Sequence, residues 1–582
     1  MKLLIYVYLF FVPLFAVAQN AHNTYCNPIN LDYGFTPIPN FSQWGKHRAT
    51  ADPVIVNYKN EYYLFSTNQW GYWCSKDLLK WDFIPRLFLK PHHKVYDELC
   101  APAVWIQGDT LLVMGSTYSK DFPIWMSTNP KANEWKEAVM EFELGGWDPQ
   151  FFVDTDERLY MYNGSSNSYP MYGVELNRST FQPIGTRKEI LLPAPHKYGW
   201  HRFGEHHDDT FLDGFMEGAF VTKHNNKYYL QWGGPGTEFS GYADGVAISE
   251  HPLGPFQHVA LPMSYKPGGF ARGAGHGATF QDKYNNYWHV STMVVNVKNS
   301  FERRLGLWPA GFDKDDVMYC NTAFGDYPHY LPTDTNRDHN RFTGWMLLNY
   351  NKPVQVSSTL GGFNANNAVD ESIKTYWSAQ SSNKGEWILS DLGEISTIHG
   401  IQINYADQDA QSLGKRTDIY HQYKVYASLD GKKWNTIIDK STNKTDVPHE
   451  YVELDKHQGK PLKARYIKLE NIHTAEGKFA IAGLRVFGFG NGEKPLPVKE
   501  FMVLRTEKDK RSAWVKWSPS SDAYAYNIYV GTDPEKLYNC IMVHNANEYY
   551  YKAMDKDIPY YFCIEAINEN GTSTRTQVVT IN

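Results

Sequence analysis

The chain has 582 residues, which is long enough for three or four domains. Its net charge of -6 gives no basic surface for nucleic acid or for an anionic membrane, so the composition excludes both as partners. Aromatic residues make up 15% of the chain, with 18 Trp and 41 Tyr, and aromatic faces suit both all-β cores and stacking on sugar rings.

Residues 1–18 have the pattern of a secretory signal peptide. They begin with a basic residue, continue with an apolar run and end in Ala-Val-Ala, which is too short and wrongly flanked for a membrane span. We expect cleavage after Ala18 and an exported protein, periplasmic or extracellular, with no membrane span. A lipid-attachment cysteine normally sits directly behind such a run, and Cys26 lies further on, so a secreted form is favoured over a lipoprotein. Six cysteines give no disulfide framework, and Cys540 and Cys563 suit one bridge or two core thiols equally.

A strand of aromatic or aliphatic residues that ends in small residues recurs five times in the first half of the chain. Each copy follows another strand and a turn, and the copies lie roughly 50 to 70 residues apart, which is the period of a propeller blade with four short strands. Residues 25–345 are therefore predicted to form a five-bladed β-propeller. The five copies are residues 62–67, 111–117, 159–164, 228–233 and 287–292.

The residues at the entrances of the innermost strands of a propeller meet at one mouth of its central channel. Three carboxylates and one histidine, from four blades, are therefore predicted to face one space. Glycoside hydrolysis needs such a group, because one protonated acid assists the leaving oxygen while one carboxylate activates water or attacks carbon. A third carboxylate can raise the pKa of its neighbour, and the residues alone leave the roles unassigned. The entrances read Ala51-Asp52-Pro53, Ala101-Pro102-Ala103, Trp147-Asp148-Pro149, Met216-Glu217-Gly218 and Gly275-His276-Gly277.

These motifs resemble those of glycoside hydrolase family 43. The resemblance implies that Asp52 is the general base, that Glu217 is the general acid, and that Asp148 tunes the pKa of the acid and orients it. It also implies inversion at the anomeric carbon, and a metal ion, often Ca²⁺, in the central channel, which His276 holds largely through water. Ala51 stands where the family often has His, and Ala219 where it often has Pro. Neither difference removes a catalytic group, but both leave the substrate open.

The family acts mainly on α-L-arabinofuranosides and β-D-xylosides. We expect an exo-acting α-L-arabinofuranosidase that removes non-reducing-end sugars from the side chains of plant-type oligo- or polysaccharides. A β-1,3-galactosidase, β-xylosidase or β-galactofuranosidase of the same family is an alternative, and a non-catalytic carbohydrate-binding propeller is a second one. Three carboxylates at strand entrances argue against the binding propeller. The Ala-Asp-Pro and Trp-Asp-Pro sequences argue against the related, retaining fructosidase and levansucrase group.

Aromatic and cationic side chains between the motifs are candidates for the wall of a sugar pocket. The run from Glu205 to Asp209 has residue types that bind metals, but adjacent side chains rarely converge on one ion, so a pocket rim or a plain loop is expected there. The predicted substrate-binding residues are Trp70, Trp147, Phe215, Arg272, Arg303 and Arg304.

Two further all-β domains follow the propeller. Residues 351–490 alternate strands with turns, which predicts a β-sandwich, and residues 367–377 resemble the early loop of the discoidin, or coagulation factor type C, fold. In bacterial enzymes that fold often serves as a carbohydrate-binding module. Relatives place an acidic calcium ligand where this chain has Ala482-Gly483-Leu484, which argues against an ion there. Residues 498–582 resemble fibronectin type III, and a spacer is expected rather than a binder.

Overall fold

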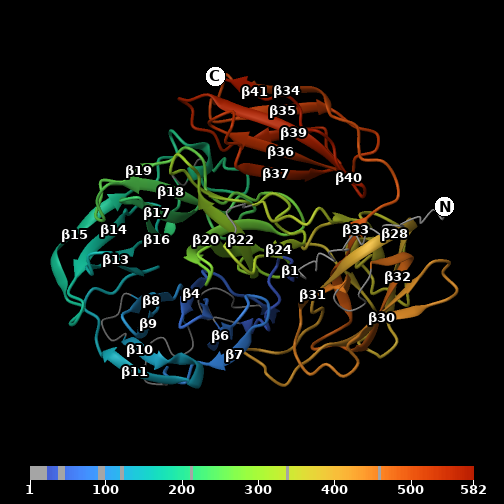
Figure 1. The fold of residues 1–582 in the computed structure, drawn as a ribbon, viewed down its shortest axis with the longest axis horizontal. Helices are drawn as coiled ribbons and strands as arrows, with labels where there is room; N and C mark the ends of the chain where they lie inside the picture. Colours follow the sequence, from blue (N-terminus) through green and yellow to red (C-terminus); the bar gives the residue numbers. More distant parts are fainter. Residues whose placement is uncertain are drawn as a thin grey trace, which may run out of the picture.

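The computed structural model describes residues 23–582, except 37–45, 68, 90–98, 118–122, 210, 212–213, 336–339 and 456–460. Strands dominate, and the short 3-10 turns are η1 (Pro130–Ala132), η2 (Gly199–His201) and η3 (Ala365–Ala368). The predicted all-β class is confirmed (Figure 1). Among the described residues, no helix is long and apolar enough to cross a membrane. The predicted signal peptide, residues 1–18, lies outside the described residues.

Five four-stranded antiparallel blades form the propeller, and one parallel bridge, between Ala243 and Ala274, joins the fourth and fifth blades into one sheet (Figure 1). In chain order they are β4 (Val54–Tyr58), β5 (Glu61–Phe65), β6 (Gly71–Ser75) and β7 (Asp82–Pro85); β8 (Ala103–Gln107), β9 (Thr110–Met114), β10 (Ile124–Asn129) and β11 (Glu134–Val139); β12 (Gln150–Val153), β13 (Leu159–Asn163), β14 (Met171–Leu176) and β15 (Pro183–Leu191); β16 (Glu217–His224), β17 (Lys227–Gly234), β18 (Ala243–Ser249) and β19 (Gln257–His258); and β20 (Arg272–Gln281), β21 (Tyr287–Val294), β22 (Arg303–Phe312) and β23 (Met318–Cys320).

The first strands of the blades contact one another in a closed ring. β4 touches β8, β8 touches β12, β12 touches β16, β16 touches β20, and β20 returns to β4. The repeated strand of the sequence is the second strand of each blade. It is buried along nearly its whole length, because other strands of its blade flank it and neighbouring blades cover its faces. This burial explains why these strands read as continuous apolar runs rather than alternating ones.

Short strands join the ends of the propeller region. β1 (Asn23–Tyr25) pairs antiparallel with β24 (His329–Leu331), and β2 (Phe35–Thr36) pairs with β3 (His47–Arg48). Cys26, directly after β1, is buried, and its thiol donates to the Asp326 carbonyl at 3.3 Å. The N-terminal segment is thus part of the folded body from Asn23 onwards.

The second domain is a sandwich built around one long strand. β28 (Trp387–Tyr405) pairs with four others and encloses a core that includes Trp377 and Phe479. The remaining strands are β25 (Met346–Leu347), β26 (Val354–Val356), β27 (Trp377–Ser378), β29 (Gln422–Ser428), β30 (Asn435–Asp439), β31 (His449–Glu453), β32 (Leu462–His473) and β33 (Ala480–Phe489).

The third domain consists of two sheets, one of three strands in the order β34-β35-β38 and one of five. Cys540 and Cys563 both pair in register with Tyr529, on opposite sides of its strand, and all six cysteines of the chain are free. They are therefore two core thiols rather than a bridge, and the likeness to fibronectin type III stays a prediction. The strands are β34 (Lys499–Arg505), β35 (Ala513–Ser518), β36 (Ala525–Gly531), β37 (Asn539–His544), β38 (Glu548–Tyr551), β39 (Tyr560–Asn568), β40 (Gly571–Thr572) and β41 (Val579–Ile581).

Buried charges and apolar contacts join the three domains. Arg485 of the second domain donates to the Glu371 carboxylate at 3.0 Å and also to the propeller carbonyl of Asp326. From the propeller, Arg48 reaches the buried Asp407 of the second domain at 2.8 Å. Trp200 of the propeller shares one apolar cluster with Tyr551 of the third domain. Since removing one partner of a buried ion pair is strongly destabilising, these contacts hold the domains in one arrangement.

Candidate active site

The blade entrances share one backbone conformation. Asp52, Ala101, Asp148 and His276 have φ angles of 53°, 37°, 53° and 42°, the left-handed region that residues other than glycine rarely adopt. In the second blade the equivalent residue is therefore Ala101, one position before the predicted Pro102. In the fourth blade Gly218 takes this conformation with φ 64°, and Glu217 precedes it. Such strained positions cluster at functional sites.

Hydroxyl side chains from the preceding blade hold these strained residues. The backbone N–H of Asp52 donates to Thr292 Oγ1 at 2.9 Å, that of Ala101 to Thr67 Oγ1 at 2.7 Å, and that of Asp148 to Ser116 Oγ at 2.9 Å. The Thr67 hydroxyl in turn donates to Asp52 Oδ2 at 2.5 Å. The small residues that end the repeated strands thus fix the entrance of the next blade.

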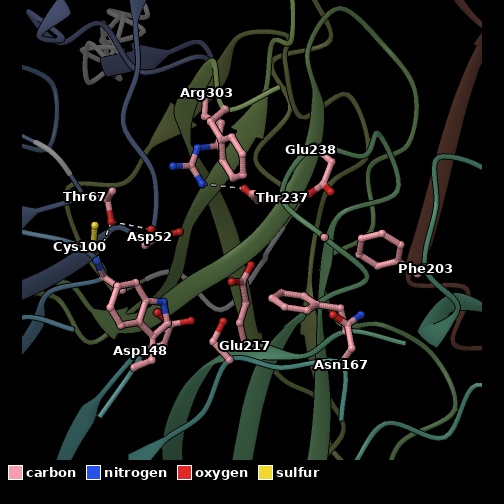
Figure 2. Close-up of a pocket in the computed structure, with 16 residues that line it drawn as sticks. Asp52, Thr67, Cys100, Asp148, Asn167, Phe203, Glu217, Thr237, Glu238 and Arg303 are labelled. Atoms are coloured by element: carbon pink, nitrogen blue, oxygen red, sulfur yellow. Dashed lines mark hydrogen bonds between the residues drawn. The ribbon is translucent and has the colours of Figure 1, made fainter. Parts of the chain in front are cut away.

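The three carboxyl groups line one cavity of about 240 Å³ (Figure 2). Asp52 and Asp148 lie on one side and Glu217 rises from the start of β16 between them and the loop that carries Glu238. His276 lies beneath, with Nδ1 at 3.2 Å from Asp52 Oδ1 and 3.9 Å from Asp148 Oδ2. The structure thus brings the three carboxyl groups and the histidine together, as the sequence predicts.

Burial gives Glu217 the protonation that a general acid needs. It raises the pKa of Glu217 to about 8, and the negative charge of Asp52 adds to this, whereas the Tyr242 hydroxyl, which donates to Glu217 Oε1, and Arg303 oppose it. Glu217 therefore carries its proton at neutral pH.

Burial also raises the pKa of Asp148 to about 8. His276 opposes this shift, and the charges of Glu217 and Asp52 add to it. Asp148 Oδ2 accepts the N–H of Gly218 at 3.3 Å, and Gly218 is the residue next to Glu217. Asp148 thus positions the backbone next to Glu217, whereas the negative charge of Asp52 raises the pKa of Glu217.

Gly218 stands at an entrance position where no side chain fits. A Cβ built there would lie 2.4 Å from Cδ2 of His276, and φ is +64°. The close approach of the imidazole therefore requires glycine, and the left-handed backbone conformation favours it.

Of the six predicted substrate-binding residues, Trp147, Phe215 and Arg303 line this cavity. Arg303 Nη1 donates to Thr237 Oγ1 at 2.9 Å, as Figure 2 shows. Arg304 does not reach the cavity. It follows Arg303 on β22, so it points to the opposite face, where it is buried and donates to His449 Nε2 at 2.8 Å.

The other two lie elsewhere. Trp70 is half-buried and packs against Gly34, whose built Cβ would lie 3.0 Å from the Trp70 ring. Arg272 lines a separate cavity, next to Glu205 and the third domain.

The sequence motifs did not indicate several residues of the cavity. Glu238 lies in Gly234-Pro-Gly-Thr-Glu238, directly after β17, and burial raises its pKa. This Gly-Pro-Gly turn at a strand end was a signal for a loop over the channel. Tyr242 is fully buried and contacts Glu217 from behind. The other unpredicted lining residues are Thr67, Cys100, Ala101, Ser165, Asn167, Phe203, Gly236, Thr237 and Phe301.

Asp148, Glu217 and His276 can also hold a metal ion. Each offers one ligand atom, and these atoms lie within 4.8 Å of one another. His276 Nδ1 is buried without a hydrogen bond, so a ligand would satisfy it. The two carboxyl groups suit a hard cation such as Ca²⁺, whereas an imidazole nitrogen is not a preferred ligand of Ca²⁺.

Comparison with known families identifies the class of protein. Residues 47–318 match the model of the glycosyl hydrolases family 43, and residues 353–483 match the F5/8 type C domain. The chain is a glycoside hydrolase. Its propeller is a family 43 domain, and its second domain is an F5/8 type C domain, as the sequence motifs predicted.

Solved structures of similar proteins are distant in sequence. One is a glycoside hydrolase with 18% identity, over 78% of this chain and 99% of that chain, with a TM-score of 0.44. Another is a family 43 protein from Bacillus licheniformis, with 14% identity over 96% of each chain and a TM-score of 0.41. A third is an α-L-arabinofuranosidase from Clostridium thermocellum, with 17% identity over 46% of this chain and 93% of that chain and a TM-score of 0.35. None of the curated proteins matches this chain.

Proposed function

We propose that this protein is an exported, inverting, exo-acting α-L-arabinofuranosidase that acts on the side chains of plant-type oligo- or polysaccharides. The observation that carries the proposal is the pairing of a protonated acid with a second carboxyl in one small cavity. Glu217 holds its proton because it is buried beside Asp52, and both line the same 240 Å³ space. Hydrolysis of a glycosidic bond requires such a pair.

Glu217 acts as the general acid. Its proton passes to the oxygen of the leaving group as the bond to the terminal sugar breaks. Tyr242 fixes the carboxyl through Oε1, and the N–H of Gly218 ties the neighbouring backbone to Asp148. These contacts hold the acid at one place and leave its other oxygen for the substrate.

Asp52 acts as the general base. The Thr67 hydroxyl donates to its Oδ2, and Thr292 holds its backbone N–H. The carboxylate takes a proton from the water that attacks the anomeric carbon from the face opposite the leaving group, which inverts the configuration. Asp148 positions Glu217 through the N–H of Gly218.

The size of the cavity supports removal of a single terminal sugar. Its volume of about 240 Å³ is below the range of about 300–1,000 Å³ that holds larger ligands. Trp147, Phe203 and Phe215 supply aromatic faces, and Arg303 and Glu238 supply polar groups at the rim. The same walls would also suit a β-xyloside, a β-1,3-galactoside or a β-galactofuranoside, which stay as alternatives.

A Ca²⁺ ion in the channel is part of the proposal. His276 would hold it through water, since imidazole is not a preferred ligand of this ion. Glu217 would not be a ligand, because it keeps its proton as the general acid.

A panel of aryl glycosides tests the proposal. Aryl α-L-arabinofuranoside, β-xyloside, β-galactoside and β-galactofuranoside are incubated with the full chain, and the anomer of the first product is followed by NMR. We expect turnover of the aryl arabinofuranoside with inversion. On native linkages, we expect Glu217→Gln to lose nearly all activity. Turnover with retention would refute the mechanism, and no turnover of any glycoside would favour the carbohydrate-binding propeller.

A further inference from the structure

A second cavity lies where the three domains meet. We call it the junction cavity, and its volume is about 420 Å³. Figure 1 shows the third domain, in red, against the side of the propeller that carries β18 and β20. The propeller, from Glu205 to Arg272, and the strand end at Tyr549 to Lys552 together line the cavity. Lys374 of the second domain reaches its edge, with Nζ at 3.4 Å from Ser240 Oγ.

Arg272 is the charged group of this cavity that has no partner. Lys552 pairs with Asp208 at 2.8 Å, and Glu205 accepts the N–H of Ser240 at 2.8 Å. In the part of the chain that the structure describes, the guanidinium of Arg272 forms neither an ion pair nor a hydrogen bond. A half-buried guanidinium presents several donors in a fixed planar fork, and a carboxylate matches this fork with two parallel hydrogen bonds.

Lys374 adds to the positive charge near Arg272. Burial lowers the pKa of Lys374, Glu205 opposes this shift, and Arg272 adds to it. Glu205 has the larger effect on Lys374, and the repulsion between the two cations is the smaller one. A ligand with a negative charge would relieve this repulsion.

The third domain supplies an aromatic wall. Tyr549 and Tyr550 line the cavity, and Tyr550 stacks on Trp514 of the neighbouring strand with ring centres 4.5 Å apart. This stacking fixes the orientation of Tyr550 and covers one face of its ring, and Lys552 Nζ lies over the ring at 5.1 Å. Tyr550 therefore offers its ring edge and its hydroxyl group to a sugar. Tyr265, buried at the base, adds a hydroxyl group.

The junction cavity adjoins the catalytic cavity. Phe203 and Glu238 line the catalytic cavity, whereas Glu205 and Ser240, each two residues further along the chain, line the junction cavity. Two residues span at most about 7 Å. Phe203, which lines the catalytic cavity, contacts Phe239, the residue before Ser240, with ring centres 4.8 Å apart.

We propose that the junction cavity is a second saccharide-binding site for a sugar that carries a carboxylate, a uronic acid. Arg272 binds the carboxylate, Lys374 adds charge at the edge, and Tyr549 and Tyr550 contact the ring. The third domain is then part of a binding site rather than a spacer. The site rests on the proposed function only in that the same glycan would also place its terminal sugar in the catalytic cavity.

Binding of small uronates to the full chain tests the site. Methyl glycosides of D-glucuronic and D-galacturonic acid are compared with the neutral methyl glucoside and galactoside by NMR titration of the Glu217→Gln protein. We expect the uronates to bind about 10- to 100-fold more tightly, as charge-assisted hydrogen bonds to a half-buried arginine would give. Arg272→Met should remove this preference. Arg158→Met is the matched control, since Arg158 is an exposed arginine of the third blade.

Three outcomes would overturn the site. They are equal binding of uronates and neutral sugars, a preference that survives Arg272→Met, and a preference that Arg303→Met removes, because Arg303 lies in the catalytic cavity. If Arg272→Met unfolds, Tyr550→Ala should weaken uronate binding instead, and unchanged binding in that variant would refute the aromatic wall. Hydrolysis of the aryl arabinofuranoside is measured separately on the unaltered protein, and its absence would refute the proposed function while leaving the binding result intact.

Discussion

The entrances of the first and third blades share one backbone conformation, but the side chains of their aspartates have different surroundings. Asp52 and Asp148 both precede a proline, share a φ of 53°, and donate their backbone N–H to a hydroxyl of the preceding blade. The side chain of Asp148 is only 4% exposed and accepts the N–H of Gly218, whereas that of Asp52 is 11% exposed and accepts the Thr67 hydroxyl. Ala101 has the same conformation without a carboxyl. The repeat therefore fixes where the entrance residue lies, and the residues around its side chain determine its role.

The largest difference should appear when each aspartate becomes asparagine. Asp52→Asn removes the general base, so we expect kcat on an aryl arabinofuranoside to fall by about 10²–10⁴-fold. Asp148→Asn keeps an oxygen that can accept the Gly218 N–H, so we expect a fall of about tenfold. Steady-state kinetics of both variants, with thermal unfolding as the control for folding, measure the difference. An equal loss in both would show that the two entrances do not differ in role.

The close approach at Gly218 gives the next largest effect. In Gly218→Ala the new Cβ meets the His276 ring, and a left-handed φ is unfavourable for alanine. We expect the free energy of unfolding to fall by about 1–3 kcal/mol and activity to fall with it, because Glu217 is adjacent. Urea unfolding measures the change in the free energy of unfolding, and steady-state kinetics measure the change in activity. Ala101→Gly is the converse control, since it relieves the same conformation and should not destabilise the fold.

The raised pKa of Asp148 predicts a smaller effect, on stability against pH. In the folded chain this carboxyl keeps its proton up to about pH 8, whereas in the unfolded chain it ionises at its ordinary, lower pKa. The unfolded state thus binds fewer protons in this window, and the stability that protonated Asp148 contributes is lost as pH rises. Asp148→Asn should therefore make the urea midpoint fall less between pH 5 and pH 8.

Asp156 provides the contrast for this measurement. It is exposed, and its hydrogen bond with Arg158 lowers its pKa. Asp156→Asn should leave the pH dependence between pH 5 and pH 8 unchanged. A change in Asp156→Asn as large as that in Asp148→Asn would mean that the effect does not come from burial at the blade entrance.

The hydroxyl partners should give the smallest effects. Thr67→Val removes the donor to Asp52 and the acceptor for Ala101, so we expect a fall in kcat of about 3- to 10-fold with little change in KM. Ser116→Ala removes the equivalent contacts of Asp148 and should change kcat less, because Asp148 keeps its bond to Gly218. A larger loss in Ser116→Ala would reverse the order of importance of the two entrances.

The sequence predicted the elements that repeat. Each second strand is buried in the same way, and each first strand begins at the same turn, so the pattern of residues 62–67 recurs through the propeller. That register by itself predicts that Asp52, Asp148, Glu217 and His276 lie together. The register was wrong by one residue in the second and fourth blades, where Ala101 and Gly218 take the left-handed conformation, because neither residue has a functional side chain that marks the turn.

Only the tertiary structure decided which side chains between the repeats face the cavity. Arg303 and Arg304 are neighbours in the sequence, and the pleat of β22 sends one to the catalytic cavity and the other to the second domain. The position of Arg272 beside Tyr550 depends on how the third domain packs on the propeller. A repeat constrains the contacts within and between blades, because they recur in the chain. Contacts between unlike domains occur once, so no pattern in the sequence records them.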